Sequence, residues 1–311
     1  MKVLTVTFNP CIDKTITISG FNYGGLNRVE DVREDMGGKG INVAKVLKSF
    51  DIACTAYTFV AGTSGKRFAE ALTQDGIEVV STEVTGEVRT NQKLVNLNDK
   101  VTTEINEKGF CVSSDDCKKA FEIIKSHLDA DTILVLAGSI PSGMDDNVYA
   151  ELTQFANSVG AKVILDADTV KLKLGIEAKP CAIKPNLYEF ELLTGKKLDT
   201  TDKIVTEAKK LIQKGTELVV VSMGADGAVF VNKDIAYKAE PFAIDCQSTV
   251  GAGDSMVAAL AYSLHKGFEL KEIAKLCVAA GSITSSKAGT QVCSKEEVIK
   301  RKDDVKIFAL Q

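Results

Sequence analysis

Three small residues and an acid close the stretch Ser248-Thr-Val-Gly-Ala-Gly-Asp254, which carries the clearest chemistry in this 311-residue chain. After it, apolar residues recur at helical spacing as far as Leu264, and Lys266 with Gly267 predicts the end of a helix. The first turn of such a helix has backbone N–H groups without partners at the positive end of the helix dipole, so it can hold an anion. Asp254 could belong to that anion site, or it could simply cap the helix.

A second glycine-rich stretch, Gly37-Gly-Lys-Gly40, stands before a helical pattern that contains Asn42. Glycines permit a positive φ and a close backbone approach, so Lys39 and Asn42 would face whatever binds there. The stretch lacks the spacing of a Walker A loop. The alternative is a tight glycine turn with an exposed lysine.

Asp13 follows the first expected strand, where its carboxylate could accept hydrogen bonds from sugar hydroxyls or could form a turn. Arg89, Asn91 and Lys93 alternate along another expected strand, so they share one face. A cationic face of this kind suits a phosphate, because an arginine fork binds phosphate oxygens bidentately. The alternative is an ordinary solvated strand face.

Two further groups of polar residues follow buried strands. Asn186 and Glu189 are three residues apart at an expected helix start, where they could hold Mg²⁺ through water or form a helix cap. Ser222, Gly224 and Gly227 form a turn suited to close approach by a nucleotide, although, taken singly, a simple loop is the better explanation.

Strands and helices alternate along most of the chain, which predicts an α/β fold. Helical patterns at 117–128, 145–159, 202–214, 254–265 and 270–285 are separated by apolar runs at 133–136, 163–165, 181–183 and 218–221. Such alternation favours a central, mostly parallel sheet with helices on both faces. Ligands of such sheets bind at the carboxyl ends of the strands, where Gly138-Ser139 and Asp166 also lie.

Two segments, 11–35 and 88–105, do not fit this alternation. Both have strand-like alternation, the second around a turn at Asn98–Lys100, and no crossover helix lies within either segment. We expect them to form a small β lid over a core made of 1–10, 36–87 and 106–311.

Composition excludes several classes of protein. The chain is 45% hydrophobic with a formal net charge of −4, and it has no basic run or long apolar run, so we expect no nucleic-acid or membrane surface. Residues 1–8 begin directly with a strand pattern, which favours a cytoplasmic protein. The eight cysteines form no C-x-x-C pair, which argues against zinc or a disulfide framework, and the two histidines lie in amphipathic helical patterns.

In combination, these stretches resemble a known family. Residues 37–44 and 248–256 are similar, in order, to the two signatures of the PfkB (ribokinase-like) carbohydrate kinases, and the resemblance covers essentially the whole chain. With residues 5–10, 138–143, 184–186 and 222–224, the pattern is similar to the phosphosugar branch, which includes 1-phosphofructokinase, tagatose-6-phosphate kinase and the minor 6-phosphofructokinase. The resemblance implies a ribokinase-like fold and ATP-dependent transfer of a phosphoryl group to a hydroxyl of a sugar phosphate.

The resemblance also implies roles for individual residues. Asp254 matches the family's general base, and the backbone amides of Gly251, Ala252, Gly253 and Asp254 match its anion hole. Sugar hydroxyls would be held by Asp13, Gly38 and Asn42, and the substrate phosphate would lie near Lys39, Arg89 and Ser139. The ATP site would be lined by Lys184, Ser222, Gly224 and Gly227, while Asn186 and Glu189 would organise Mg²⁺. Lid strands in this family commonly pair between two subunits, which implies a homodimer.

The chain also departs from its relatives. Ser248 stands where some have an Asp associated with a monovalent cation, which argues against a K⁺ site. Lys39 fits 1-phosphofructokinase and tagatose-6-phosphate kinase, whereas residues 278–282 and 289–293 look closer to the minor 6-phosphofructokinase. We expect conversion of fructose 1-phosphate to fructose 1,6-bisphosphate, with tagatose 6-phosphate or fructose 6-phosphate as alternative acceptors. A non-catalytic sugar-phosphate-binding regulator is a more distant alternative.

Overall fold

The computed structural model describes residues 2–99 and 101–310, so Lys100 at the end of the expected Asn98–Lys100 turn lies outside the described residues. The large sheet contains β1 (Lys2–Thr7), β4 (Cys54–Ala61), β5 (Glu78–Val84), β8 (Thr132–Ala137), β9 (Lys162–Asp166), β10 (Ala182–Ile183), β11 (Leu218–Ser222), β12 (Ala228–Val231), β13 (Ala236–Glu240) and β14 (Lys306–Leu310). A smaller sheet contains β2 (Cys11–Ile18), β3 (Asp31–Gly37), β6 (Arg89–Asn96) and β7 (Val101–Asn106).

The helices are α1 (Lys39–Ser49), α2 (Gly62–Gln74), α3 (Ser114–Ser126), α4 (Val148–Ser158), α5 (Thr169–Ile176), α6 (Leu187–Thr194), α7 (Thr201–Gln213), α8 (Ala252–Lys266), α9 (Leu270–Ser285) and α10 (Lys295–Arg301). Within the described residues, no helix combines the length and apolar character needed to cross a lipid bilayer.

The large sheet has the strand order β14-β13-β12-β11-β10-β9-β8-β1-β4-β5. Its strands are parallel from β5 through β11, which confirms the predicted mostly parallel α/β sheet. From β11 to β14 the pairing is antiparallel, an edge that the sequence pattern did not indicate. β12 and β13 follow β11 through short connections, and β14 comes from the C-terminal end of the chain. These strands therefore show no strand–helix alternation in the sequence.

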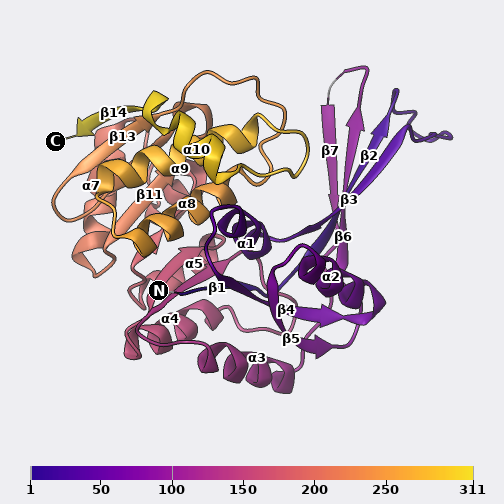
Figure 1. The fold of residues 1–311 in the computed structure, drawn as a ribbon, viewed down its shortest axis with the longest axis horizontal. Coiled ribbons are helices and arrows are strands. Elements are labelled where there is room, and N and C mark those ends of the chain that lie inside the picture. Colours follow the sequence, from indigo (N-terminus) through magenta and orange to yellow (C-terminus); the bar gives the residue numbers. More distant parts are fainter. Residues whose placement is uncertain (1, 100, 311) are drawn as a thin grey trace.

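Helices cover both faces of the sheet because successive residues of each strand point to opposite sides. In β1, Leu4 and Val6 join the core under α2 to α7, whereas Val3 joins the core under α1, α8, α9 and α10. Buried residues that alternate in this way need apolar cover on both faces. Figure 1 shows the two helical layers on either side of the sheet.

The smaller sheet, which we call the lid, projects from the core (Figure 1). Its order is β3-β2-β6-β7, with β2 and β6 parallel and the outer pairs antiparallel. The parallel pair is possible because α1, β4, α2 and β5 lie between β2 and β6 in the chain and provide the crossover. The segments 11–35 and 88–105 thus contribute to a sheet of their own, while their use as domain boundaries stays a prediction.

Candidate active site

A cavity of about 430 Å³ lies between the lid and the carboxyl ends of β1 and β8. Its lining includes the predicted residues Asp13, Gly38, Lys39, Asn42, Arg89, Ser139, Glu189 and Asp254. These residues come from the lid, from three helices and from a strand-end loop. The parallel sheet brings them together, because its strands end at the same edge.

Asp254 lies in the first turn of α8 and is buried. Asn42 of α1 donates a hydrogen bond from Nδ2 to Asp254 Oδ2 over 2.7 Å. The N-cap position is Gly251, in the left-handed conformation and without a side-chain cap, so the described residues do not show the helix cap that Asp254 could have formed. The Asp254 carboxylate is therefore held by a neighbouring helix and faces the cavity.

The pKa of Asp254 is raised to about 6, mainly by burial. Within that net shift, the ammonium groups of Lys39 and Lys184 and the hydrogen bond from Asn42 lower the pKa, whereas the nearby charge of Asp166 adds to the rise. A carboxyl group with this pKa is largely ionised at neutral pH and still accepts a proton readily, which suits acid–base chemistry.

Asp166, at the end of β9, binds two of the predicted lysines. Lys39 Nζ lies 3.1 Å from its Oδ1 and Lys184 Nζ lies 3.5 Å from its Oδ2. Burial alone would raise the pKa of Asp166, but the charges of Lys184 and Lys39 outweigh burial and lower it. Asp166 in turn raises the pKa of Lys39. The sequence placed Asp166 at a strand end but gave it no role, since a pairing across 127 residues leaves no local pattern.

Lys184 also reaches the start of α8. A Cβ atom added at Gly253 would lie 3.4 Å from Lys184 Nζ, so only the bare glycine backbone separates the ammonium group from this helix turn. The backbone N–H groups of residues 251–254 and the lysine combine their positive potentials at one point. This end of the cavity can hold an anion.

The lid contributes a buried ion pair. Lys93 Nζ lies 3.4 Å from Asp13 Oδ1, and Asn91 Nδ2 donates to the same oxygen over 3.5 Å. Lys93 is thus engaged with a carboxylate, which the expectation of an open cationic strand face did not include. A Cβ atom at Gly37 would lie 2.3 Å from Asp13 Oδ2, so a side chain there would have to displace the paired carboxylate.

Arg89 and Ser139 both contact Asn9, which lies just after the end of β1. Arg89 donates from Nη1 to the Glu107 carbonyl and from Nη2 to the Asn9 carbonyl. The side chain of Asn9 donates to Ser139 Oγ over 3.3 Å. Gly38 lies nearby with φ 115°, and its missing side chain leaves room for Thr7, whose Cγ2 would be 2.7 Å from a Cβ atom.

The other predicted nucleotide residues lie away from this cavity. Ser222, Gly224 and Gly227 are not among the described residues that line it. They form the turn between β11 and β12, in which the Ser222 N–H donates to the Pro185 carbonyl and both glycines have a positive φ. The turn therefore lies against the segment after Lys184.

Asn186 and Glu189 form a capping box at the start of α6. Each accepts a hydrogen bond from the backbone N–H of the other over 2.8 Å. Glu189 also lines the cavity, and its charge contributes to the raised pKa of Lys39. Within the described residues, no cluster of three His, Cys, Asp or Glu side chains could enclose a metal ion. The donor set fits Mg²⁺ held through water and substrate phosphates, because Mg²⁺ commonly keeps several waters and takes only one or two carboxylates.

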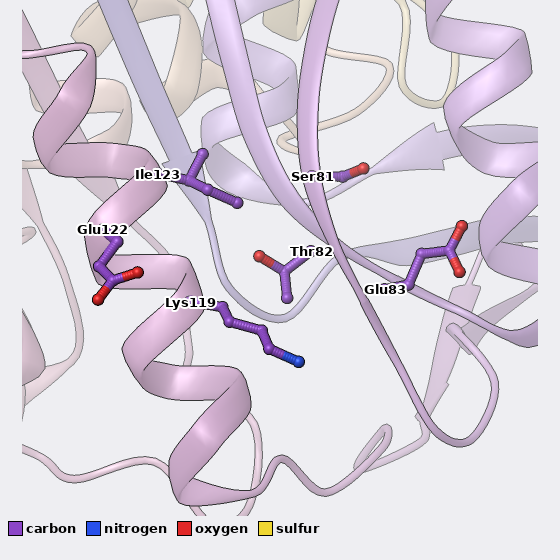
Figure 2. A pocket seen from close by; sticks show the side chains of 6 residues that line it. All are labelled: Ser81, Thr82, Glu83, Lys119, Glu122 and Ile123. Atoms are coloured by element: carbon purple, nitrogen blue, oxygen red, sulfur yellow. The ribbon is translucent and has the colours of Figure 1, made fainter.

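A second hollow, of about 350 Å³, lies between β5 and α3 (Figure 2). Figure 2 shows Glu83 and Glu122 on opposite sides of the hollow, with Lys119 between them in this view. None of its lining residues belongs to the predicted set, and its charged groups do not converge. Convergent polar groups are what a chemical site requires, so the cavity at Asp254 is the better candidate.

Comparisons with known proteins identify the family of the chain. Residues 6–297 match the pfkB family of carbohydrate kinases. A 1-phosphofructokinase from Bacillus subtilis is 36% identical over 93% of this chain and 95% of its own, and one from Xanthomonas campestris is 37% identical over 90% and 89%. The crystal structure of phosphofructokinase-2 from Escherichia coli in complex with potassium has a TM-score of 0.93 at 26% identity, covering 97% of this chain and 98% of that one. The chain therefore belongs to the pfkB family of carbohydrate kinases and is a sugar-kinase phosphotransferase.

Proposed function

We propose that the protein transfers the terminal phosphoryl group of ATP to a hydroxyl of a ketohexose phosphate, with fructose 1-phosphate as the preferred acceptor and fructose 1,6-bisphosphate as the product. One observation carries this proposal: the buried Asp254 carboxylate lies at the start of α8, where Lys39 and Lys184 also converge. The choice of fructose 1-phosphate is supported by Lys39 and by relatives named 1-phosphofructokinase.

In this mechanism, Asp254 accepts the proton of the attacking hydroxyl, and the hydrogen bond from Asn42 orients the carboxylate. The amides of residues 251–254 stabilise the charge that develops on the transferring group. Phosphoryl transfer depends mainly on positioning and electrostatics. One well-aimed donor contributes on the order of 3 kcal/mol to such a transition state. Lys184 adds its positive charge at the same helix end.

The acceptor occupies the cavity under the lid. Its hydroxyls bind Asp13, Gly38 and Asn42, and its phosphate binds Lys39, Arg89 and Ser139. The Lys93 pairing supports the role of Asp13, because it fixes a carboxylate that sugar hydroxyls can approach. Asp166 holds Lys39 and Lys184 together, one at each carboxylate oxygen. Its single negative charge leaves the two lysines with a net positive charge for the phosphates.

ATP lies along Lys184 and the turn that contains Ser222, Gly224 and Gly227. Asn186 and Glu189 would hold Mg²⁺ through water, and the bound ion would supply positive charge to neutralise the phosphates. Because Ser248 stands where some relatives have an Asp associated with a monovalent cation, we propose that turnover does not require K⁺. Because the Escherichia coli relative was solved in complex with potassium, equal rates in K⁺ and Na⁺ buffers are the decisive expected result.

We also propose a cytoplasmic homodimer that pairs through the lid. All eight cysteines, which lie within the described residues, are free thiols, as expected for a reducing compartment.

An assay of ADP release against fructose 1-phosphate, tagatose 6-phosphate and fructose 6-phosphate tests the function. The ranking by kcat/KM identifies the acceptor, and fructose 1-phosphate is expected to rank first. A preference for unphosphorylated sugars would contradict the phosphate role of Lys39 and Arg89. Tight binding of a sugar phosphate without any ADP release would favour the regulator instead.

A further inference from the structure

Asn9 is a polar residue of the cavity to which no role has been given so far. It lies two residues beyond β1 and is 5% exposed. β1 pairs in parallel with β8 at a constant offset, Thr5 with Val135, and the same offset brings Asn9 to Ser139. The register of two buried strands therefore sets this contact.

The orientation of the Asn9 amide follows from its partners. The Lys108 carbonyl can only accept a hydrogen bond, so the amide group that lies 3.3 Å from it is Nδ2. The same Nδ2 donates to Ser139 Oγ over 3.3 Å. Arg89 Nη2 donates to the backbone carbonyl of Asn9 over 3.2 Å. One residue thus joins the lid strand β6, the segment that leaves the lid at Lys108 and the loop after β8.

This network is not arranged for maximum stability. Within the described residues, Asn9 Oδ1 and Arg89 Nε are both buried without a hydrogen-bond partner. Buried polar atoms without partners cost folding free energy, and exceptions of this kind call for another explanation. Oδ1 lies against the backbone, since a Cβ atom at Gly109 would be only 2.6 Å from it. The unpaired oxygen indicates that the Asn9 amide has a task other than stabilising the fold.

We propose that Asn9 is a positioning residue for the phosphate of the acceptor: it fixes Arg89 and Ser139 relative to each other. The inference rests on the proposed function, in which both residues bind that phosphate. Arg89 belongs to the lid and Ser139 to the core, so their separation is not set by one rigid element. Two donors must lie within about 3 Å of the same phosphate oxygens, and a misplacement of about 1 Å weakens binding.

Isothermal titration calorimetry on the 311-residue chain tests this role. One probe is whichever of fructose 1-phosphate, tagatose 6-phosphate and fructose 6-phosphate the wild type binds most tightly, and the other is the ATP analogue AMP-PNP. Asn9→Ala removes both donated hydrogen bonds. If the alanine variant does not fold, the Asn9→Ser variant is used in its place. The matched control is Asn157→Ala, because Asn157 Nδ2 also donates to two backbone carbonyls, those of Ala178 and Lys179, outside the cavity.

The Asn9 variant is expected to raise the Kd of the sugar phosphate about tenfold, the loss that corresponds to one charge-assisted hydrogen bond. The Kd of AMP-PNP should stay within about twofold, and the control should leave both values within that range. In a Ser139→Ala background, the Asn9 substitution should raise the Kd of the sugar phosphate by a smaller factor, because the two side chains act together.

An unchanged Kd for the sugar phosphate would overturn the inference, and so would equal losses for both ligands, since a loosened fold affects both. A wild type that binds none of the three sugar phosphates would overturn the proposed function itself, and the inference with it.

Discussion

Asp254 carries its charge at a position where the protein interior disfavours one. Its pKa is about 6 in the folded protein, against 3.8 as its ordinary value. The proposed base is therefore a source of instability at neutral pH. Strain of this kind is common at sites where a function requires it.

Replacing the base separates catalysis from folding. Asp254→Asn keeps the shape of the side chain and an acceptor for the Asn42 hydrogen bond, so fold and AMP-PNP binding should persist. The variant cannot accept the proton, and turnover should fall by at least about 10²-fold. ADP release under saturating substrates measures this. Turnover near that of the wild type in a clean preparation would exclude Asp254 as the base.

The same variant should be more stable than the wild type at high pH. Because the folded-state pKa is raised, the contribution of Asp254 to stability is complete below pH 4 and is lost as the pH rises through about 6. Above pH 7 Asp254→Asn should gain on the order of 3 kcal/mol in free energy of unfolding, or several degrees in Tm. At pH 4 the gain should vanish. Thermal unfolding at both pH values measures it, and a gain that is independent of pH would point to a cause other than charge.

At the level of single residues, the sequence identified most of the groups that line the cavity but not their pairing. Asn42 and Asp254 are 212 residues apart, so no spacing rule could join them. Asp166 was placed at a strand end, yet its contacts with two lysines depend on the sheet order. The capping box of Asn186 and Glu189 was one of two interpretations of the same spacing, because a cap and a water-mediated metal site use the same residue types.

At the level of elements, the boundaries of the long amphipathic helices were predicted to within a few residues. The pattern at 202–214 corresponds to α7, and Gly267, with φ 70°, ends α8 as expected. The helix predicted at 117–128 starts later in the sequence than the observed α3. The reason is that α3 begins with a capping box of Ser113 and Asp116, before its first apolar residue. Helices α5 and α6, of eight residues each, are too short to show a clear period.

The turn between β11 and β12 allows a matched test of two glycines. A Cβ atom at Gly227 would lie 1.9 Å from the Ala239 carbonyl oxygen, whereas one at Gly224 would meet nothing within 4 Å. Both have a positive φ, 83° and 59°. Gly224→Ala should cost about 1 kcal/mol, the penalty of the left-handed conformation alone. Gly227→Ala must also displace β13 and should cost on the order of 4 kcal/mol.

Thermal unfolding of the two variants compares these costs, and loss of soluble protein in the Gly227 variant alone would agree with the prediction. Similar Tm values would mean that β13 adjusts easily.

At the level of the whole molecule, the lid is the part least covered by its own chain. Large apolar side chains are exposed on it among the described residues: Phe21, Tyr23, Leu26, Val29, Val32, Leu97, Val101 and Ile105. Tyr23 is 93% exposed. A concentration of this kind marks an interaction surface, and the outer strands β3 and β7 also leave backbone groups unpaired. A second copy of the lid would cover both.

The double variant Leu26→Asp and Val32→Asp should therefore shift the protein from dimer to monomer. Each charge would have to be buried without a partner, which an interface does not tolerate. Light scattering after size exclusion gives the mass, and Ile299→Asp on α10, also an exposed apolar position, is the control. Asp13 and Arg89 reach the cavity from the lid. In the monomeric variant, the KM for the acceptor should therefore rise more, relative to wild type, than the KM for ATP. A monomeric wild type, or a double variant that stays dimeric, would contradict pairing through the lid.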